Sequence, residues 1–305
     1  TLAIVYLPLL FTQFKHLLST HLCTSIVKSF TTSNQHLYSL LSFTHLRSIS
    51  VKPDPFTFPP LLKSISHLNF TNLGVSTHCL IIKLGLIADV FSSTALVSMY
   101  SGFGRVGDAR RVFDEMPSRN SVSWNAMITG CVHNRRFKEA HGIFREMLAS
   151  GFELGEVTVV GALSACAHLG ALSQGVWIHE YIDRAGIRVN VFVGTALVDM
   201  YMKCGEVAKA VRVFQGMRFK NIFSWNVLIS GFAMNSRGGM AMESFDMMLS
   251  ERVKPDGVTF LALLCACCHH GFVDKGRRFF DELRTCHGVR PKIEHYGCMV
   301  DLLGR

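Results

Sequence analysis

Residues 90–100 read VFSSTALVSMY, and residues 191–201, one hundred and one positions later, read VFVGTALVDMY. The same offset relates SWN at residues 123–125 to SWN at residues 224–226. Within this long period a small residue returns in steps of 35, 31, 35, 35, 31 and 35 residues, at Gly74, Ala109, Ala140, Gly175, Ala210, Ala241 and Gly276. Self-similarity with a period of about 20–50 residues is typical of solenoids, so this repetition decides the fold.

Bulky apolar residues follow each small residue at helical spacing. Ala109, for example, is followed by Val112, Phe113 and Met116, which occupy one face of an α-helix. A second apolar stretch lies upstream, and a glycine or a polar break separates the two. Each repeat is therefore predicted to be a helical hairpin that is stabilised by stacking on its neighbours. We expect an all-α fold of about fourteen or fifteen antiparallel helices, with the seven small residues at close helix crossings.

The repeats end at Pro-Asp turns or at asparagines, because proline stops a helix and the following Asp or Asn can cap the next. From Pro55 the chain divides into 55–89, 90–120, 121–155, 156–190, 191–221, 222–256, 257–292 and a partial repeat, 293–305. The chain does not begin with methionine and stops inside an expected first helix, which indicates a fragment that lacks a C-terminal cap.

Residues 1–54 form a segment of different composition. No acidic residue precedes Asp54, whereas four basic residues do, and Ser and Thr are frequent. This composition is typical of an organelle transit peptide. The segment is equally well explained as a degenerate first repeat whose second helix is residues 36–48, and both explanations can hold together.

The charge and hydropathy of the chain restrict its partners. The net charge is +9, of which +4 belongs to residues 1–53 and +5 to the rest, so the repeats are only mildly basic. Such a balance permits nucleic-acid binding without requiring it. Hydrophobic residues make up 49% of the chain, but no run reaches the roughly 18 apolar residues of a membrane span. We expect no membrane partner.

The ten cysteines do not form a disulfide framework. Cys131, Cys166 and Cys267 each hold the eleventh place of a repeat, where a small buried hydrophobe is wanted, and such thiols fit a reducing compartment. The cluster CACCHH at residues 265–270 contains a C-x-x-C pair, but its counterpart at residues 164–168 is SACAH, and no second ligand pair has zinc spacing. We therefore predict a helix interior with no metal.

No catalytic motif is present. The chain lacks a P-loop, a dinucleotide fingerprint, a nucleophile elbow and the H-x-E and P-C-x-x-C signature of zinc deaminases. We expect no enzyme activity, no cofactor and no small-molecule substrate.

Polar residues recur beside the tryptophans. Trp124 and Trp225 are predicted to lie in the core, and Asn125 and Asn226 follow them; Thr94 and Thr195 hold the same place in the short repeats. Asn120, Asn221 and Asp256 close their repeats. These residue types are common helix caps and turn formers. Alternatively, because Asn125 and Asn226 lie inside the helical pattern, they are placed to contact a ligand that itself repeats.

These motifs resemble plant pentatricopeptide repeat (PPR) proteins of the PLS subfamily. The matching strings include SVSWNAMITG (121–130), VFVGTALVDMYMKCG (191–205), ARRVFDEMPSRN (109–120) and HYGCMVDLLGR (295–305). By this resemblance the P-type repeats are 121–155 and 222–256, and the S-type repeats are 90–120 and 191–221. The L-type repeats are 55–89, 156–190 and 257–292, and residues 293–305 begin a further S-type repeat.

The resemblance implies a right-handed superhelix that binds single-stranded RNA in a mitochondrion or chloroplast, one nucleotide per repeat. In this family the second residue of a repeat wedges between bases, and the fifth and last residues select the base. The second residues are all apolar here: Phe56, Phe91, Val122, Val157, Phe192, Phe223 and Val258.

The implied base preferences follow repeat by repeat. Thr94 with Asn120, and Thr195 with Asn221, match the pair that favours adenine, and Asn226 with Asp256 matches the pair for uracil. Asn125 with Gly155 retains only a weak pyrimidine preference. The L-type pairs, Pro59/Asp89, Val160/Asn190 and Leu261/Lys292, match no clear base. Lys203 and Arg135 are candidates for contacts with the RNA backbone.

Members of this subfamily continue into C-terminal E or DYW motifs and direct C-to-U editing of organellar transcripts. The resemblance implies that this chain, which lacks that extension, supplies the address for editing or other processing, with editing-complex proteins as partners. The alternative is a protein-interaction solenoid of the tetratricopeptide type. Against it, those repeats keep a period of about 34 residues, whereas steps of 31 and 35 alternate here.

Overall fold

The computed structural model describes residues 20–304, and all regular elements in this range are helices. Nine helices are first helices of a hairpin: α2 (Thr20–Thr32), α4 (Phe58–His67), α6 (Val90–Gly102), α8 (Ser121–His133), α10 (Glu156–Leu169), α12 (Val191–Lys203), α14 (Ile222–Met234), α16 (Gly257–His270) and α18 (Ile293–Leu303). Eight are second helices: α3 (His36–Ser48), α5 (Thr71–Lys83), α7 (Val106–Glu115), α9 (Phe137–Ala149), α11 (Leu172–Arg184), α13 (Val207–Gly216), α15 (Gly238–Ser250) and α17 (Val273–Thr285). A 3₁₀ turn, η2 (Leu86–Ala88), follows α5. The expected all-α fold is confirmed.

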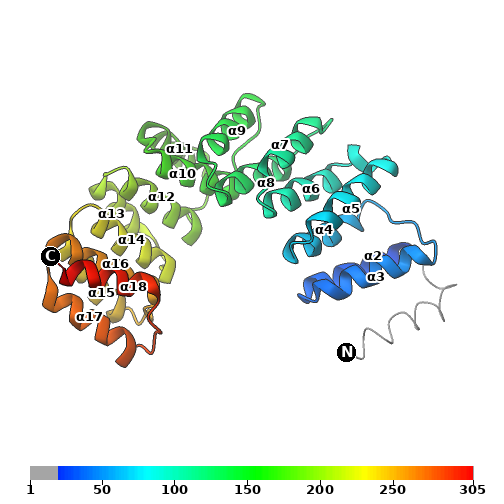
Figure 1. The fold of residues 1–305 in the computed structure, drawn as a ribbon. Helices are drawn as coiled ribbons and strands as arrows, with labels where there is room; N and C mark the ends of the chain where they lie inside the picture. Colours follow the sequence, from blue (N-terminus) through cyan, green and yellow to red (C-terminus); the bar gives the residue numbers. More distant parts are fainter. Residues whose placement is uncertain (1–19, 305) are drawn as a thin grey trace. The chain divides into compact units, whose positions relative to one another are not determined.

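The chain divides into two compact parts, an N-terminal half (Thr1–Glu153) and a C-terminal half (Leu154–Arg305). In the N-terminal half the first helices α2, α4, α6 and α8 pack in sequence order, and each contacts its own second helix (Figure 1). In the C-terminal half α10, α12, α14, α16 and α18 pack in the same way. Within each half, successive hairpins therefore bury their apolar faces against one another, as a helical repeat requires.

All seven periodic small residues are buried, as expected for close helix crossings. The glycines show how close: a Cβ on Gly175 would lie 2.4 Å from Met200 Sδ, and one on Gly276 would lie 2.2 Å from Leu302 Cδ2. In both cases the second helix of one repeat meets the first helix of the next. The small side chain is what permits this approach.

The breaks between paired helices adopt left-handed backbone conformations. Gly170 (φ 65°) ends α10 and Gly271 (φ 67°) ends α16, where a glycine C-cap carries no steric penalty. At the corresponding turn after α8 the residue is Arg135, with φ 58°. The turns thus lie where the sequence predicted them.

The segment expected to be a leader is helical from Thr20 onward. Residues 36–48 form α3, as the degenerate-repeat explanation expects, and the preceding α2 packs on α3 and on α4. These two helices add to the fifteen α-helices that the structure shows from α4 to α18. A targeting role for residues 1–54 stays a prediction, and residues 1–19 lie outside the described residues.

The periodic cysteines lie in the core. Cys131, Cys166 and Cys267 are fully buried and unpaired, which confirms their expected role as small hydrophobes. Burial raises the pKa of each of these thiols to about 11. Trp124 and Trp225 are also buried, and each meets a phenylalanine edge-on, at centroid distances of 4.8 Å to Phe113 and to Phe214 respectively.

Between residues 20 and 304 no helix has the length and apolarity needed to cross a bilayer.

Gly175→Leu should destabilise the fold by about 1–3 kcal/mol, because the added side chain overpacks against Met200. Gly142→Leu in α9 is the matched control, since a Cβ there meets no atom within 4 Å. It should be neutral or stabilising, because glycine is a poor helix former. Urea denaturation measures both, and equal losses in the two variants would contradict the crossing geometry.

Stability should fall as the pH rises above 9. In the unfolded chain the three buried thiols ionise near the ordinary pKa of 9.0, whereas in the folded chain they ionise near 11. The unfolded state therefore releases its protons first, so the free energy of unfolding is undiminished below pH 9 and declines between about pH 9 and 11. Urea titrations across this range check the decline. A variant with Cys131, Cys166 and Cys267 changed to alanine should lose less, and an unchanged slope would refute the assignment.

Candidate nucleic-acid interface

The second residue of every complete repeat from 55 to 292 is an exposed hydrophobe. The seven side chains, Phe56, Phe91, Val122, Val157, Phe192, Phe223 and Val258, are between 54% and 68% exposed. Six of the seven lie in the first turn of a first helix, and Phe56 lies in the turn before α4. Large apolar side chains exposed at one repeated position indicate a binding surface rather than scattered surface residues.

The last residue of most repeats caps the first helix of the next. A side-chain oxygen of Asp89, Asn120, Asn190, Asn221 and Asp256 accepts a hydrogen bond from the backbone N–H three residues on, over 2.7–3.1 Å. The interpretation of Asn120, Asn221 and Asp256 as helix caps is thus confirmed. In Asn120 and Asn221 the cap bond uses Oδ1 and does not involve the amide nitrogen.

Asn226 and Asp256, the fifth and last residues of repeat 222–256, are joined directly. Asn226 Nδ2 donates to Asp256 Oδ1 over 3.0 Å, and Thr259 Oγ1 donates to Asn226 Oδ1 over 2.6 Å. Asp256 Oδ1 also accepts from the backbone N–H groups of Val258 and Thr259. Asp256 Oδ2 accepts no hydrogen bond from the described residues. Asn226 is only 6% exposed and both of its amide atoms are hydrogen-bonded, so the pair is held in one arrangement before any ligand binds.

Thr94 and Thr195 hold the fifth position of the short repeats, in α6 and α12. Both are half-buried, and the hydroxyl of each lacks a hydrogen bond from the part of the chain that the structure describes. A buried hydroxyl without a partner is costly, so the recurrence of this feature at one repeat position is notable. The same position in repeat 121–155 is Asn125, which is half-buried in α8.

Other expected contact residues differ in their surroundings. Gly155 precedes α10 and offers no side chain to a base. Pro59, Val160 and Leu261 are half-buried in α4, α10 and α16. Lys203 is held in an ion pair with Asp199 at 2.8 Å, which makes it a poor candidate for a phosphate contact, whereas Arg135 is exposed.

The third residue of the following repeat was missed by the sequence analysis. Ser123, Ser224 and Thr259 each complete a capping box with the preceding Asn or Asp, and all three are fully buried. The signal was available, since an Asn or Asp followed three positions later by Ser or Thr opens these helices. These residues hold the base-selecting candidates in place.

The cysteine and histidine side chains of residues 265–270 contact neighbouring protein groups. Cys265 Sγ lies 3.6 Å from Cys298 Sγ, Cys268 Sγ donates to the Cys298 carbonyl, and both His269 and His270 meet backbone carbonyls. Among residues 20–304, no group of three or more His, Cys, Asp or Glu side chains is arranged to hold a metal. The absence of zinc itself stays a prediction.

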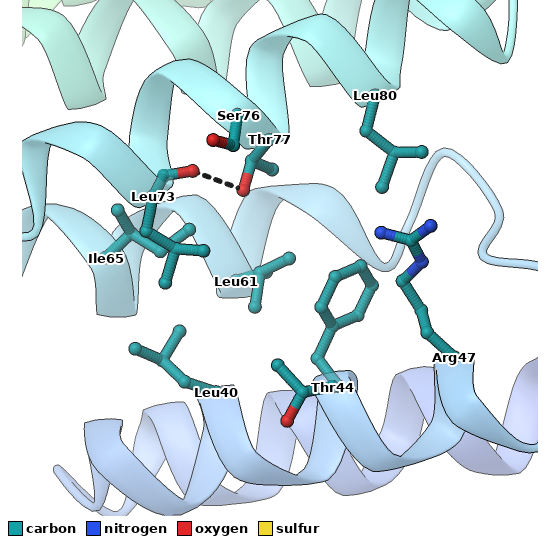
Figure 2. A pocket seen from close by; sticks show the side chains of 10 residues that line it. Leu40, Thr44, Arg47, Leu61, Ile65, Leu73, Ser76, Thr77 and Leu80 are labelled. Carbon is teal, nitrogen blue, oxygen red and sulfur yellow. Dashed lines mark hydrogen bonds between the residues drawn. The ribbon is translucent and has the colours of Figure 1, made fainter.

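A hollow of about 290 Å³ lies between α3, α4 and α5 (Figure 2). Leu40 and Arg47 of α3 face Leu73 and Leu80 of α5 across it, and Leu61 of α4 lies between. Its lining is mostly aliphatic and borders second helices. It is therefore separate from the surface of second, fifth and last residues.

Comparisons with known proteins agree with this arrangement. Residues 119–168 and 220–269 match the PPR repeat family, residues 91–121 and 258–287 match the PPR repeat, and residues 177–223 match the pentatricopeptide repeat domain. The chain is 41% identical to the Arabidopsis thaliana pentatricopeptide repeat-containing protein At4g38010, covering 92% of this chain and 50% of that protein. It is 43% identical to At1g59720, chloroplastic/mitochondrial, of the same plant, covering 83% of this chain and 40% of that protein. The chain thus spans about half the length, or less, of these relatives.

Among solved structures, the fold is similar to PPR10 in complex with an 18-nt psaJ RNA element. The TM-score is 0.80 at 20% identity, covering 93% of this chain and 43% of PPR10. A second structure, PPR10 from maize, gives a TM-score of 0.72 at 20% identity, covering 93% of this chain and 41% of PPR10. This likeness confirms the expected helical-repeat fold. Together with the matched repeats, it shows that the chain belongs to the pentatricopeptide repeat family of plants.

Proposed function

We propose that this chain binds single-stranded RNA in a sequence-specific manner, one nucleotide per repeat. The observation that carries the proposal is an exposed apolar second residue in every complete repeat from 55 to 292, joined in repeats 90–120, 191–221 and 222–256 by a polar fifth residue and a last residue fixed by its cap bond. An apolar side chain offers a face on which any base stacks, and polar atoms beside it offer selective hydrogen bonds to the base edge. The structure of PPR10 in complex with an 18-nt psaJ RNA element supports the same class of ligand.

Base choice follows from the chemistry of each pair. The RNA runs 5′ to 3′ from the N-terminal to the C-terminal repeats. The five repeats from residue 90 to 256 then prefer, in order, adenine, a pyrimidine (weakly), no particular base, adenine and uracil. Thr94 with Asn120, and Thr195 with Asn221, take adenine. Gly155, the last residue of the repeat that contains Asn125, has no side chain to contact a base, so selectivity at this repeat is low.

The Asn226/Asp256 pair makes the sharpest choice. Uracil presents one N–H between two carbonyl groups. Asp256 Oδ2 accepts the N–H, and the Asn226 amide, which has a second hydrogen besides the one donated to Asp256, approaches a carbonyl. A purine at this site is both mispaired and crowded.

The cellular role is the recognition of an organellar transcript for C-to-U editing or other processing. Two relatives carry the words chloroplastic or chloroplastic/mitochondrial in their names, which supports an organelle. The alternation of repeat lengths supports membership of the PLS subfamily, whose C-terminal E or DYW extension and editing partners would supply the chemistry. This chain recognises the RNA sequence and does not catalyse the reaction. A peptide-binding solenoid is not favoured, because the matched families are pentatricopeptide repeats.

Asn226→Thr should shift the preference at one nucleotide from U toward G and leave neighbouring positions unchanged, because the amide donor is replaced by a shorter hydroxyl. Discrimination of about 1–3 kcal/mol is expected for a two-point base contact. Gel-shift titration at fixed salt, against RNAs varied one base at a time, measures the shift. If Asn226→Thr weakens every RNA equally, Asn226 is only a structural residue.

Phe223→Ala should weaken all RNAs alike, by about 1–3 kcal/mol, because stacking contributes affinity without selecting a base. Phe219→Ala is the matched control: both phenylalanines are 67% exposed, but Phe219 lies in the turn before α14 and not at a second position. The same titrations should show no change for Phe219→Ala. Equal losses in the two variants would argue against a stacking role for the second position.

A further inference from the structure

Three cysteine side chains meet where α16 packs on α18. Cys265 and Cys268 lie about one turn apart on α16, and Cys298 lies on α18. The Sγ atoms of Cys265 and Cys298 are 3.6 Å apart, and Cys268 Sγ donates to the Cys298 carbonyl oxygen over 3.1 Å. All three side chains are free thiols in this structure. Two thiols from neighbouring repeats are thus in direct contact.

The packing of first helices does not require a thiol at both places. Cys265 holds the ninth place of its repeat, and Cys298 holds the sixth place of the next. At three other junctions these places hold Ser98 and Ala126, Ser164 and Ala196, and Ser230 and Ala262. From residue 55 onward, cysteine stands at both places only at this junction. The pair is therefore a departure from the repeat pattern, unlike the eleventh-place cysteines, which belong to it.

Both thiols are closer to solvent than the cysteines of the core. Cys265 and Cys298 are half-buried, whereas Cys267 is fully buried and Cys268 is 4% exposed. A small oxidant can therefore reach the pair from the surface. A solvent-accessible thiol with a second thiol beside it is the arrangement from which a disulfide forms.

The geometry requires only a small movement of the two sulfur atoms. A disulfide bond is about 2.05 Å long, so the two atoms have to approach each other by about 1.5 Å. Rotation about the Cα–Cβ bond of a cysteine moves its sulfur by more than this distance. Since α16 and α18 already pack against each other, the bond needs no new contact between helices.

We propose that Cys265 and Cys298 form a reversible disulfide that fastens α18 to α16 when the chain meets a peroxide. The Cys265 thiolate attacks one oxygen of hydrogen peroxide and the O–O bond breaks, which leaves a sulfenic acid on Cys265; the departing hydroxide and the thiol proton form water. The Cys298 thiolate then attacks the Cys265 sulfur and the S–O bond breaks, which releases the second water. Two thiols lose two electrons and two protons in all, and one peroxide is reduced to two waters. A dithiol reductant reverses the bond by exchange.

The surroundings of the two thiols set the order in which they react. Burial and the neighbouring Cys265 raise the pKa of Cys298 to about 12, and Asp301 on the same helix adds to this shift. Burial and Cys268 also raise the pKa of Cys265, but the hydrogen bond with Cys298 opposes that shift. Because the thiolate is the attacking species, Cys265 reacts first and Cys298 resolves the sulfenic acid. With both pKa values raised, the reaction is slow at neutral pH and responds to prolonged oxidation.

The test uses the full chain, treated with hydrogen peroxide, blocked with iodoacetamide and digested with trypsin without reduction. Mass spectrometry should find residues 253–275 joined to residues 293–305, two hydrogens lighter than the two peptides together. Dithiothreitol should separate them. The initial rate of joining should rise about tenfold per pH unit near neutrality, as the thiolate fraction does. A rate that does not change with pH would contradict the attack by a thiolate.

Three variants identify the thiols that react. Cys265→Ser and Cys298→Ala place the residues found at other junctions, so both should fold, and neither should give the joined peptides. Cys268→Ser is the matched control: its hydroxyl can still donate to the Cys298 carbonyl, and the joined peptides should form as before. Circular dichroism checks that each variant is folded. Joined peptides that persist in Cys265→Ser would refute the pair, because another cysteine of α16 would then be the partner.

The exposed Cys286, which follows α17, reports whether the oxidant has acted. If peroxide oxidises Cys286 and residues 253–275 remain separate from residues 293–305, the proposal is wrong. Amide hydrogen exchange in α18 should slow on oxidation of the unaltered chain and stay unchanged in Cys298→Ala, because a crosslink opposes local opening. Equal exchange before and after oxidation would overturn the fastening of α18. None of these outcomes depends on RNA binding, since the two thiols hold neither second, fifth nor last positions.

Discussion

One hydrogen bond organises this protein: the last side chain of a repeat accepts the backbone N–H three residues into the next. It recurs at Asp54, Asp89, Asn120, Asn190, Asn221 and Asp256. By satisfying an otherwise unpaired N–H group it stabilises the start of the first helices that follow these residues. Because the start is fixed, the second residue faces solvent, the third is buried and the fifth lies one turn further along.

The helix cap and the proposed base contact use different oxygen atoms of the aspartate, so the two interactions do not compete. In Asp256 the Oδ1 atom holds the helix start and the fifth residue, Asn226, and Oδ2 accepts no hydrogen bond from the described residues. A side chain fixed in this way loses little further conformational entropy when it binds a base, and such preorganisation favours affinity and selectivity. Asn226 is buried because its amide nitrogen donates to Asp256 Oδ1 and its amide oxygen accepts from Thr259 Oγ1.

Most of the fold could be predicted from the repeated pattern in the sequence. The regular spacing of small residues predicted where the helices cross. Only Gly or Ala lets a second helix come as close to the next first helix as α11 does to α12, where Gly175 meets Met200. The eleventh-place cysteines and both tryptophans were correctly assigned to the core. Lys203 pairs with Asp199 one helical turn away, a spacing of four residues that the sequence itself shows, and its contact with RNA stays a prediction. Residues 20–54 were harder to assign, since a composition rich in Ser and Thr obscured the helical spacing of their few apolar side chains.

The sequence by itself determined the repeat length, the helix pairs, the buried small residues and the apolar second positions, because these depend on local periodicity and on hydrophobicity. Only the tertiary structure decided which polar atoms are already used. It joined Asn226 to Asp256 and Thr24 to Asp54 across 30 residues, and it placed Phe56 beside Phe91. It also left the hydroxyls of Thr94 and Thr195 without a hydrogen-bond partner among residues 20–304. Hydrogen bonds depend on distances of a few tenths of an ångström, and those distances are set by how one helix packs on the next, which no local pattern encodes.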